Sequence, residues 1–125
     1  MKHTTEFDTE SGICTVFVTG ILKRPDDSIK LQRFAREFGS KNNCNLFLFD
    51  LRKAEINGSL LDTYTAATVP EDVDKSQVKQ KIALVYNDKI TEEEKFLENV
   101  AVNRGYNLRV FNQLEEAMKW LTMNK

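Results

Sequence analysis

The sequence predicts an α/β fold: a mostly parallel five-stranded sheet with an antiparallel hairpin strand at its amino end. Residues 45–51, five of which are apolar, and the apolar residues 82–86 form stretches too short for helices, which is typical of central strands buried on both faces. Each run is followed by residues with helical periodicity, so strands and helices alternate along the chain. Near the amino end, two strand-like segments are separated by a short turn at Ser11-Gly12, which favours a hairpin.

The first two strands are expected at residues 2–8, which alternate in polarity, and at residues 13–19, which are rich in β-branched side chains. Gly20 is predicted to end the second of them. A helix should then begin at Pro25, because proline is tolerated in the first turn of a helix. Its apolar residues recur three and four positions apart, as a single buried stripe requires: Leu31, Phe34, Ala35 and Phe38. Gly39 is the expected carboxyl cap.

A short helix is predicted to begin near Ser59 and to end at Pro70. The polar residues 70–80 are expected to form a loop or a loose helix. After strand 82–86, the sequence Thr91-x-x-Glu94 is a capping box, which predicts a helix that ends at Gly105.

The chain is expected to finish with strand 108–111 and a helix capped by Asn112 and Glu115. The apolar stripe of that helix consists of Leu114, Ala117, Met118 and Leu121. Trp120 stands beside the stripe, so the sequence allows either a half-buried side chain or an exposed contact. The full order is β-β-α-β-α-β-α-β-α without linker or repeat, and a single domain over residues 1–125 is expected.

Composition excludes several classes of function. Eighteen basic and nineteen acidic residues give a net charge of −1, so there is no surplus of positive charge to neutralise nucleic-acid phosphates. The closest basic pairs, Lys23-Arg24 and Lys79/Lys81, are interpreted as solvated surface. No apolar run approaches the roughly 20 residues of a membrane helix, and the amino terminus lacks an apolar signal core. A cytoplasmic protein is therefore expected.

Cys14 and Cys44 are expected to be buried thiols that act as small hydrophobes. Neither belongs to a C-x-x-C motif, and the single histidine of the chain, His3, does not complete a usual zinc set with them. If their strands are neighbours a disulfide is conceivable, although a reducing compartment would keep it open. No metal and no cofactor is predicted.

One face of the predicted sheet raises the question of a partner. If the strands lie in sequence order, right-handed crossovers place every connecting helix on the same face. The opposite face would then be uncovered, although the central strands are apolar on both faces. An apolar surface of that size normally meets a partner, a second subunit or a ligand. Replacing Phe47 or Phe49, whichever faces outward, by lysine should then abolish association and leave the fold intact.

Three stretches of the sequence carry a resemblance to a known family. They are residues 46–54, an apolar strand that ends in Asp-Leu-Arg, residues 81–88, and residues 108–121. In this order they resemble the STAS domain, which is named for sulphate transporters and anti-sigma-factor antagonists. The likeness covers nearly the whole chain and is greatest to a divergent bacterial branch grouped with CRAL-TRIO-like lipid-transfer folds. It implies a STAS-like fold and a regulatory, protein-binding role.

In anti-sigma-factor antagonists, the turn before the second helix carries Asp-Ser-Ser-Gly or a close variant, and its serine is phosphorylated. Counting from Asp50 aligns Asn57, Gly58 and Ser59 with that turn, so the resemblance implies Ser59 as the phosphoacceptor, or the turn as a partner-binding element. The acid, the second serine and the following glycine of the family's turn are absent here. Serine is also a preferred amino cap, and capping is the interpretation that we favour.

Polar residues follow the predicted central strands. Asp50 and Arg52 lie on the same side of one strand, and Asn87 and Asp88 follow the next. Because parallel strands end at one edge of a sheet, these four residues form a candidate strand-end site. The Asp–Arg pair either holds a substrate or is a structural ion pair. No nucleophile has an evident base, since His3 lies in the expected frayed terminus, and no Gly-rich nucleotide motif is present, so an enzyme is not expected.

Two functions remain open from the sequence. The first is a protein-interaction module that binds a regulator or itself through the edge of the second helix or the open sheet face. The second is a carrier or sensor of a small apolar ligand or lipid, which should hold a cavity on the order of several hundred Å³ beneath the helices. The candidate apolar face or pocket consists of Phe17, Phe47, Phe49, Tyr64 and Tyr86. Aromatic residues of this kind also form ordinary cores.

Overall fold

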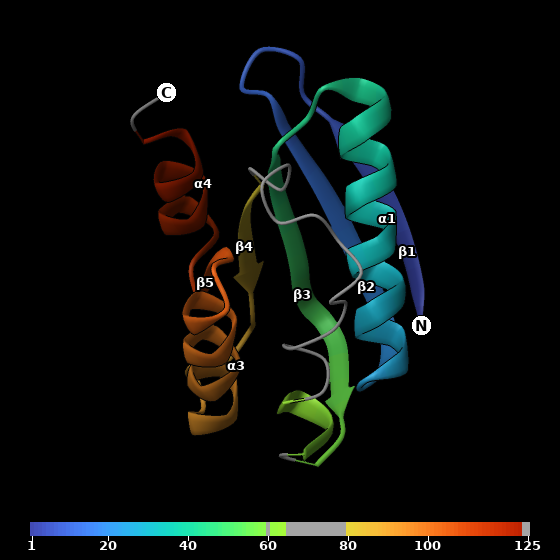
Figure 1. The fold of residues 1–125 in the computed structure, drawn as a ribbon, viewed down its shortest axis with the longest axis vertical. Helices are drawn as coiled ribbons and strands as arrows, with labels where there is room; N and C mark the ends of the chain where they lie inside the picture. The colour runs from blue at the N-terminus through green and yellow to red at the C-terminus, as the bar shows by residue number, and fades with distance from the viewer. Residues whose placement is uncertain (60, 65–79, 124–125) are drawn as a thin grey trace.

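The computed structural model describes residues 1–59, 61–64 and 80–123. One sheet contains β1 (Lys2–Phe7), β2 (Ile13–Lys23), β3 (Leu46–Asn57), β4 (Lys81–Val85) and β5 (Asn107–Phe111). The helices are α1 (Asp26–Asn42), α3 (Glu92–Asn103), α4 (Leu114–Thr122) and a short helix at residues 61–64. β1 and β2 are antiparallel, the other strand pairs are parallel, and the strands lie in sequence order (Figure 1). The predicted fold class is confirmed.

The predicted ends of two strands are wrong. β2 continues through Gly20 to Lys23, and β3 continues to Asn57. Beyond the end of β4 these two strands pair with each other and form a ribbon that starts at Thr19 and Lys53. Gly20 has a φ of +84°, which glycine adopts without strain, so it does not end the strand.

One extra residue in β3 shifts the register of this pair. Phe17 lies opposite Asp50 and Thr19 lies opposite Lys53, so β2 advances by two residues (19 − 17) while β3 advances by three (53 − 50). The extra residue is a β-bulge at residues 51–52, which bends the strand and re-aims its side chains. Periodicity in the sequence does not reveal such a bulge.

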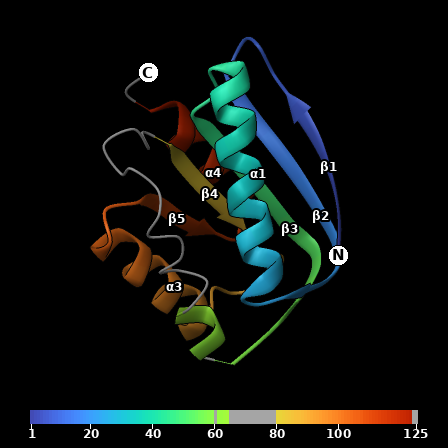
Figure 2. The ribbon, with the colours of Figure 1, turned by 45° about the vertical axis from the view of Figure 1, so that its right-hand side comes forward.

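The core has two parts, one on each face of the sheet. On the first face, Leu31 and Ala35 of α1 pack against a group of strand residues: Cys14, Val16, Val18, Phe47, Phe49 and Leu51. On the second face, Ala117 and Leu121 of α4 pack against another group: Ile13, Leu48, Ala83, Val85 and Phe111. The two helices therefore lie on opposite sides of the sheet (Figure 2).

The expected uncovered apolar sheet face is therefore wrong. The connecting helices α1 and α3 lie on the same side of the sheet, as the handedness rule requires (Figure 2). α4 follows the last strand and connects it to no other, so the rule does not constrain it, and it turns back across the second face. Phe47 and Phe49 are 0% and 4% exposed and both point toward α1, so neither faces outward.

Helix α1 ends later than the sequence predicts. It runs through Gly39 to Asn42, and Asn43 adopts the left-handed conformation that caps it, with a φ of 50°. Gly39 has a different role, because a Cβ at this position would lie 2.5 Å from the carbonyl oxygen of Cys44. The glycine lets the chain after α1 pass close to the helix.

The capping box of α3 is confirmed, since Glu94 N–H donates to Thr91 Oγ1 at 3.3 Å. The predicted cap of α4 by Asn112 is wrong, because Gln113 is the cap residue and its side chain makes no capping bond. Met118 was expected in the buried stripe of α4 but is 44% exposed.

Trp120 is half-buried on α4, with its ring 5.7 Å from that of Phe111. The Lys81 ammonium lies 4.5 Å from the Trp120 ring centroid and donates to the Trp120 carbonyl oxygen. Lys81 is therefore a packed residue and not solvated surface. Lys79 lies outside the described residues, as do most of the predicted helix before Pro70 and nearly all of the predicted loop 70–80.

Both cysteines are free thiols in the core, as predicted. Burial raises the pKa of Cys14 to about 12, so its thiol stays protonated and unreactive at neutral pH. Cys44 Sγ lies 3.4 Å from the carbonyl oxygen of Gly12. Within the described part of the chain, no helix has the length and apolarity that crossing a bilayer requires.

Candidate functional site

The turn Asn57-Gly58-Ser59 ends β3 and leads into the short helix 61–64. Ser59 N–H donates to Asp62 Oδ2 at 2.8 Å, and Asp62 N–H donates to Ser59 Oγ at 3.1 Å. The two residues thus satisfy each other's free backbone donors, which is the reciprocal arrangement of a capping box. The favoured interpretation of Ser59 as an amino cap is confirmed. All three turn residues are exposed.

Arg24 supports this turn from inside the protein, although the sequence indicated solvated surface. It is 7% exposed, and its backbone N–H donates to the Asn57 carbonyl oxygen at 2.8 Å. A Cβ on Gly58 would lie 2.9 Å from the Arg24 Cβ, so glycine is needed where the two segments meet. The backbone of Arg24 therefore fixes the position of the turn relative to the sheet.

The guanidinium of Arg24 ties together three segments of the chain. It donates to the Tyr86 hydroxyl at 3.1 Å, just after β4, and to Thr63 Oγ1 at 3.5 Å in the short helix. Its Nε has no hydrogen-bond partner among the residues that the structure describes. Burial raises the pKa of Tyr86 to about 12, so the phenol stays neutral beside the cation. This buried contact holds the short helix in place.

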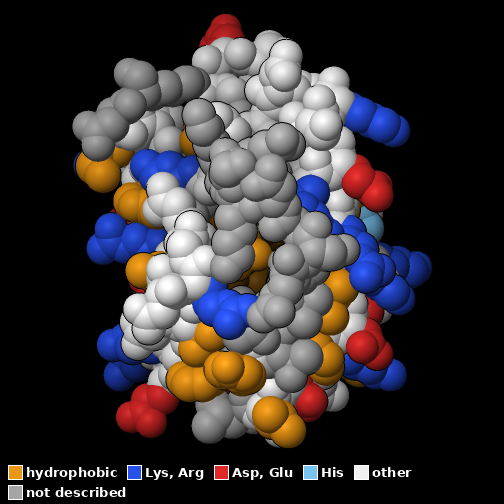
Figure 3. All heavy atoms as spheres, in the orientation of Figure 1, with side chains coloured by type: hydrophobic (Ala, Val, Ile, Leu, Met, Phe, Trp, Pro, Cys, Tyr) orange, Lys and Arg blue, Asp and Glu red, His pale blue; other side chains and the backbone are white. Residues whose placement is uncertain are grey.

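The short helix exposes apolar side chains outward from this support. Leu61 is 71% exposed and Tyr64 is 46% exposed. The Tyr64 ring lies 6.4 Å from the ring of Phe96 on α3, which is half-buried. Figure 3 shows hydrophobic side chains gathered over the lower part of this face, where the short helix and α3 lie. We call Leu61, Tyr64 and Phe96 the helix-edge patch.

Asp50 and Arg52 form a bidentate ion pair on the second face of the sheet, the face that α4 covers in part. Arg52 Nε donates to Oδ1 at 2.9 Å, and Nη2 donates to Oδ2 at 2.8 Å. The Asp50 side chain is 9% exposed and the Arg52 side chain is 42% exposed. These hydrogen bonds hold the pKa of Asp50 below its ordinary value, so the carboxylate is ionised at neutral pH.

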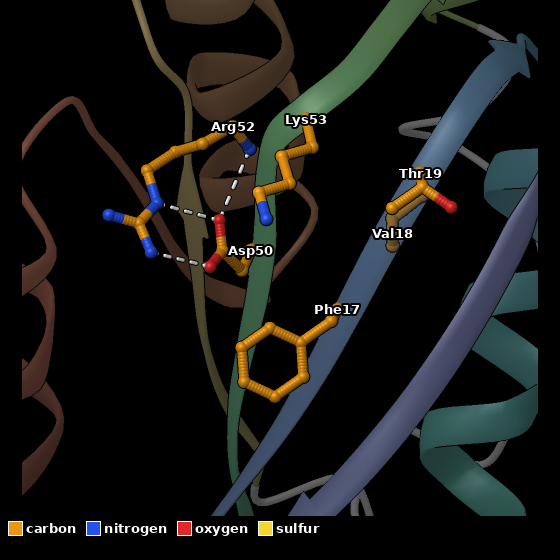
Figure 4. Close-up of a pocket in the computed structure, with 6 residues that line it drawn as sticks. All are labelled: Phe17, Val18, Thr19, Asp50, Arg52 and Lys53. Carbon is orange, nitrogen blue, oxygen red and sulfur yellow. Dashed lines mark hydrogen bonds and ion pairs between the residues drawn. The ribbon is translucent and has the colours of Figure 1, made fainter.

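This ion pair lines an open groove of about 550 Å³ beside the β-bulge (Figure 4). The lining residues are Phe17, Val18 and Thr19 of β2 and Asp50, Arg52 and Lys53 of β3. Figure 4 shows the Phe17 ring below the Asp50–Arg52 pair on the same side of the two strands. Phe17 supplies an apolar side chain to the groove, and its charged lining consists of the paired Asp50 and Arg52 together with Lys53.

The structure separates some of the other predicted site residues. Asn87 and Asp88 are exposed bend residues just after β4, which ends opposite Asp50. Among the described residues, no hydrogen bond or ion pair joins them to the Asp50–Arg52 pair. No group of three or more His, Cys, Asp or Glu side chains in the described segments is arranged to hold a metal ion.

The five candidate aromatic residues occupy three different places. Phe47, Phe49 and Tyr86 lie in the α1-side core, where the Tyr86 hydroxyl also accepts a hydrogen bond from Arg24. Phe17 lines the groove on the opposite face, and Tyr64 is exposed at the helix edge. They do not line one common pocket.

Arg52→Gln is expected to raise the pKa of Asp50 toward its ordinary value, because it removes both guanidinium hydrogen bonds. A carboxyl group whose pKa is lower in the folded state stabilises the fold above a pH of about 4, and this contribution is lost as the pH falls through the folded pKa. The stability difference between wild type and Arg52→Gln should therefore shrink below a pH of about 4. NMR titration of the Asp50 carboxyl carbon measures the pKa, and Lys53→Gln, which removes only a weaker charge interaction, should raise it less than Arg52→Gln does. An unchanged Asp50 pKa in Arg52→Gln would contradict the conclusion that the guanidinium hydrogen bonds lower it.

Ser59→Ala is expected to lower the free energy of unfolding by about 1 kcal/mol, because it removes the acceptor for Asp62 N–H. Ser59→Thr keeps a hydroxyl and should lose less. Urea unfolding of the three proteins measures the difference. Equal stability of Ser59→Ala and wild type would show that the cap contributes nothing.

No protein-family model matches this sequence, and no curated protein matches it significantly. Among solved structures, the chain is similar to the crystal structure of an anti-sigma factor antagonist from Mycobacterium paratuberculosis. The two chains are 15% identical with a TM-score of 0.56, and the alignment covers 96% of this chain and 94% of that one. At this identity the likeness establishes the fold alone. It confirms the STAS-like fold that the sequence resemblance implied.

Proposed function

We propose that this protein is a non-enzymatic regulatory module that binds another protein through the helix-edge patch and the turn at residues 57–59. The exposure of Leu61 and Tyr64 on one turn of helix is the observation that carries the proposal. A fold shared with an anti-sigma factor antagonist agrees with such a role.

The patch has the properties of a binding surface rather than of scattered apolar exposure. Leu61 and Tyr64 are three residues apart and thus lie on one side of their helix. The Tyr64 ring lies beside the half-buried ring of Phe96, which extends the apolar surface onto α3. Tyrosine is enriched at the energetically important centres of interfaces. The Ser59–Asp62 cap and the Arg24 contacts hold these side chains in place before a partner arrives, which lowers the entropic cost of binding.

Affinity purification of the tagged protein from cells that naturally express it tests this proposal. The double variant Leu61→Ser/Tyr64→Ser should lose a partner that wild type retains, with affinity reduced about 30-fold or more. Met118→Ser is the matched control, because Met118 is also exposed but lies on α4, across the sheet. A partner retained by the double variant and lost by the control would overturn the proposal.

The groove favours a second candidate function, the carriage or sensing of a small ligand. Its volume falls in the range of small-molecule sites, and it combines the Phe17 ring with Arg52 and Lys53. The groove lies on the α4 side of the sheet and is open, so it differs from the enclosed cavity beneath the helices that a carrier was expected to have.

Native mass spectrometry of the purified protein, compared with its denatured mass, tests for a carried ligand. A non-covalent adduct that Phe17→Ala and Arg52→Gln both reduce would support a ligand in the groove. A native mass without any adduct, together with an intact partner complex, would support the protein-binding function and not the carrier function.

A further inference from the structure

We propose that a second copy of this chain pairs antiparallel with the outer edge of β1, which joins the two sheets into one. Within the described residues β1 pairs with β2 alone, in a regular register without a bulge. Its six residues contain no proline, one of the features that usually prevent edge-to-edge pairing. The other edge strand, β5, is flanked by α3 and α4.

The sequence of β1 is complementary to itself in one symmetric register. With Thr4 opposite Thr4 of the second copy, Lys2 of each chain lies opposite Glu6 of the other. Lys2, Thr4 and Glu6 are all exposed, and among the described residues neither Lys2 nor Glu6 takes part in an ion pair within its own chain. Opposite charges directly across two strands stabilise their pairing.

The other face of β1 fits the same register. His3 lies opposite Thr5 of the second copy, and Phe7 lies opposite its Met1. The Phe7 side chain is 37% exposed and rests on Phe38 of α1 at a ring distance of 5.8 Å. Met1 packs at the border of the α1-side core. Pairing would therefore extend the apolar core across the dimer axis.

Neighbouring registers lack this complementarity. Moving the axis from Thr4 to Thr5 places Thr4 opposite Glu6 and removes both Lys2–Glu6 pairs. Lys2 would then lie opposite Asp8, which is beyond the end of β1 and whose carboxylate already accepts from Glu10 N–H and Ser11 Oγ. Slipping one strand by a single residue brings side chains of opposite faces together. The charges on β1 thus specify one arrangement. In it, the helix-edge patches of both copies lie away from the shared edge, so this inference does not depend on the proposed function.

Charge reversal tests the pairing, with sedimentation equilibrium of the whole chain as the measurement. Glu6→Lys places like charges opposite each other twice per dimer and should weaken the dimer about tenfold or more. The double variant Lys2→Glu/Glu6→Lys restores opposite charges and should recover the wild-type dissociation constant. Glu55→Lys makes the same charge change on the exposed part of β3 and should leave it unchanged.

Three outcomes overturn the inference. The wild-type chain remains a monomer at millimolar concentration, or Glu6→Lys dimerises as well as wild type, or the double variant fails to recover while far-ultraviolet circular dichroism shows that it is folded.

Discussion

Phe47→Lys is expected to prevent folding and not merely to disturb an interface. Phe47 is 0% exposed, and its ring lies 6.3 Å from that of Phe38 and 6.4 Å from that of Phe49. An ammonium group in this apolar core would lose its hydration with no carboxylate in the surrounding cluster to compensate. The expected loss is comparable to the whole stability of a domain, about 5–15 kcal/mol.

Circular dichroism and urea unfolding measure this loss. Leu61→Lys is the matched control, because it introduces the same charge at a side chain that is 71% exposed and should change stability by less than about 0.5 kcal/mol. Phe47→Ala should fall between the two, with a loss of about 3–5 kcal/mol. A folded Phe47→Lys with wild-type stability would mean that Phe47 faces outward after all.

Ala117→Asp is expected to detach α4 and to expose the second sheet face. Ala117 is 0% exposed and belongs to the cluster with Leu48 and Val85. A carboxylate at this contact has no partner in the cluster, so a loss of several kcal/mol is expected, about 3 or more. The apolar strand residues that α4 covers would then be accessible, and the variant should self-associate and bind a hydrophobic dye.

Met118→Asp is the control for Ala117→Asp, because it is the next residue on the same helix and is 44% exposed. Its oligomeric state should equal that of wild type, and its free energy of unfolding should change by less than about 0.5 kcal/mol. Thermal unfolding and dye fluorescence compare the two variants. If they behave alike, α4 does not cover the sheet face.

The order and type of the elements were predictable from the sequence because short apolar runs and capped, periodic helices are local signals. The Thr91–Glu94 capping box is an example. The ends of β2 and β3 were not predictable, because the ribbon beyond Thr19 and Lys53 is held by pairing between strands and interrupted by a bulge. Neither feature leaves a hydrophobic period in the sequence.

The covering of the second sheet face was missed for a different reason. The handedness rule applies to a helix between two parallel strands, and α4 follows the last one. The sequence shows the apolar stripe of α4 but not the sheet face against which it packs. The strands at 45–51 and 82–86 are apolar on both faces, so each face of the sheet needs a covering helix. In this chain α4 covers the second face.

The candidate site was only partly predictable. The Asp50–Arg52 pair and the Ser59 cap follow from neighbours in sequence, and the structure shows both. Arg24 was missed, because its partners Thr63 and Tyr86 are 39 and 62 residues away in the chain. Its place between the end of a strand and the proline that opens a helix was the only local signal.

Site-specific photo-crosslinking at Leu61 tests the central claim, that the helix edge binds a partner, most directly. Benzoylphenylalanine placed at position 61, in cells that naturally express the protein, is predicted to form one discrete heteromeric adduct that Tyr64→Ser reduces. The same probe at position 118, on the opposite side of the sheet, should form no such adduct. A discrete adduct from position 118 and none from position 61 would contradict the account.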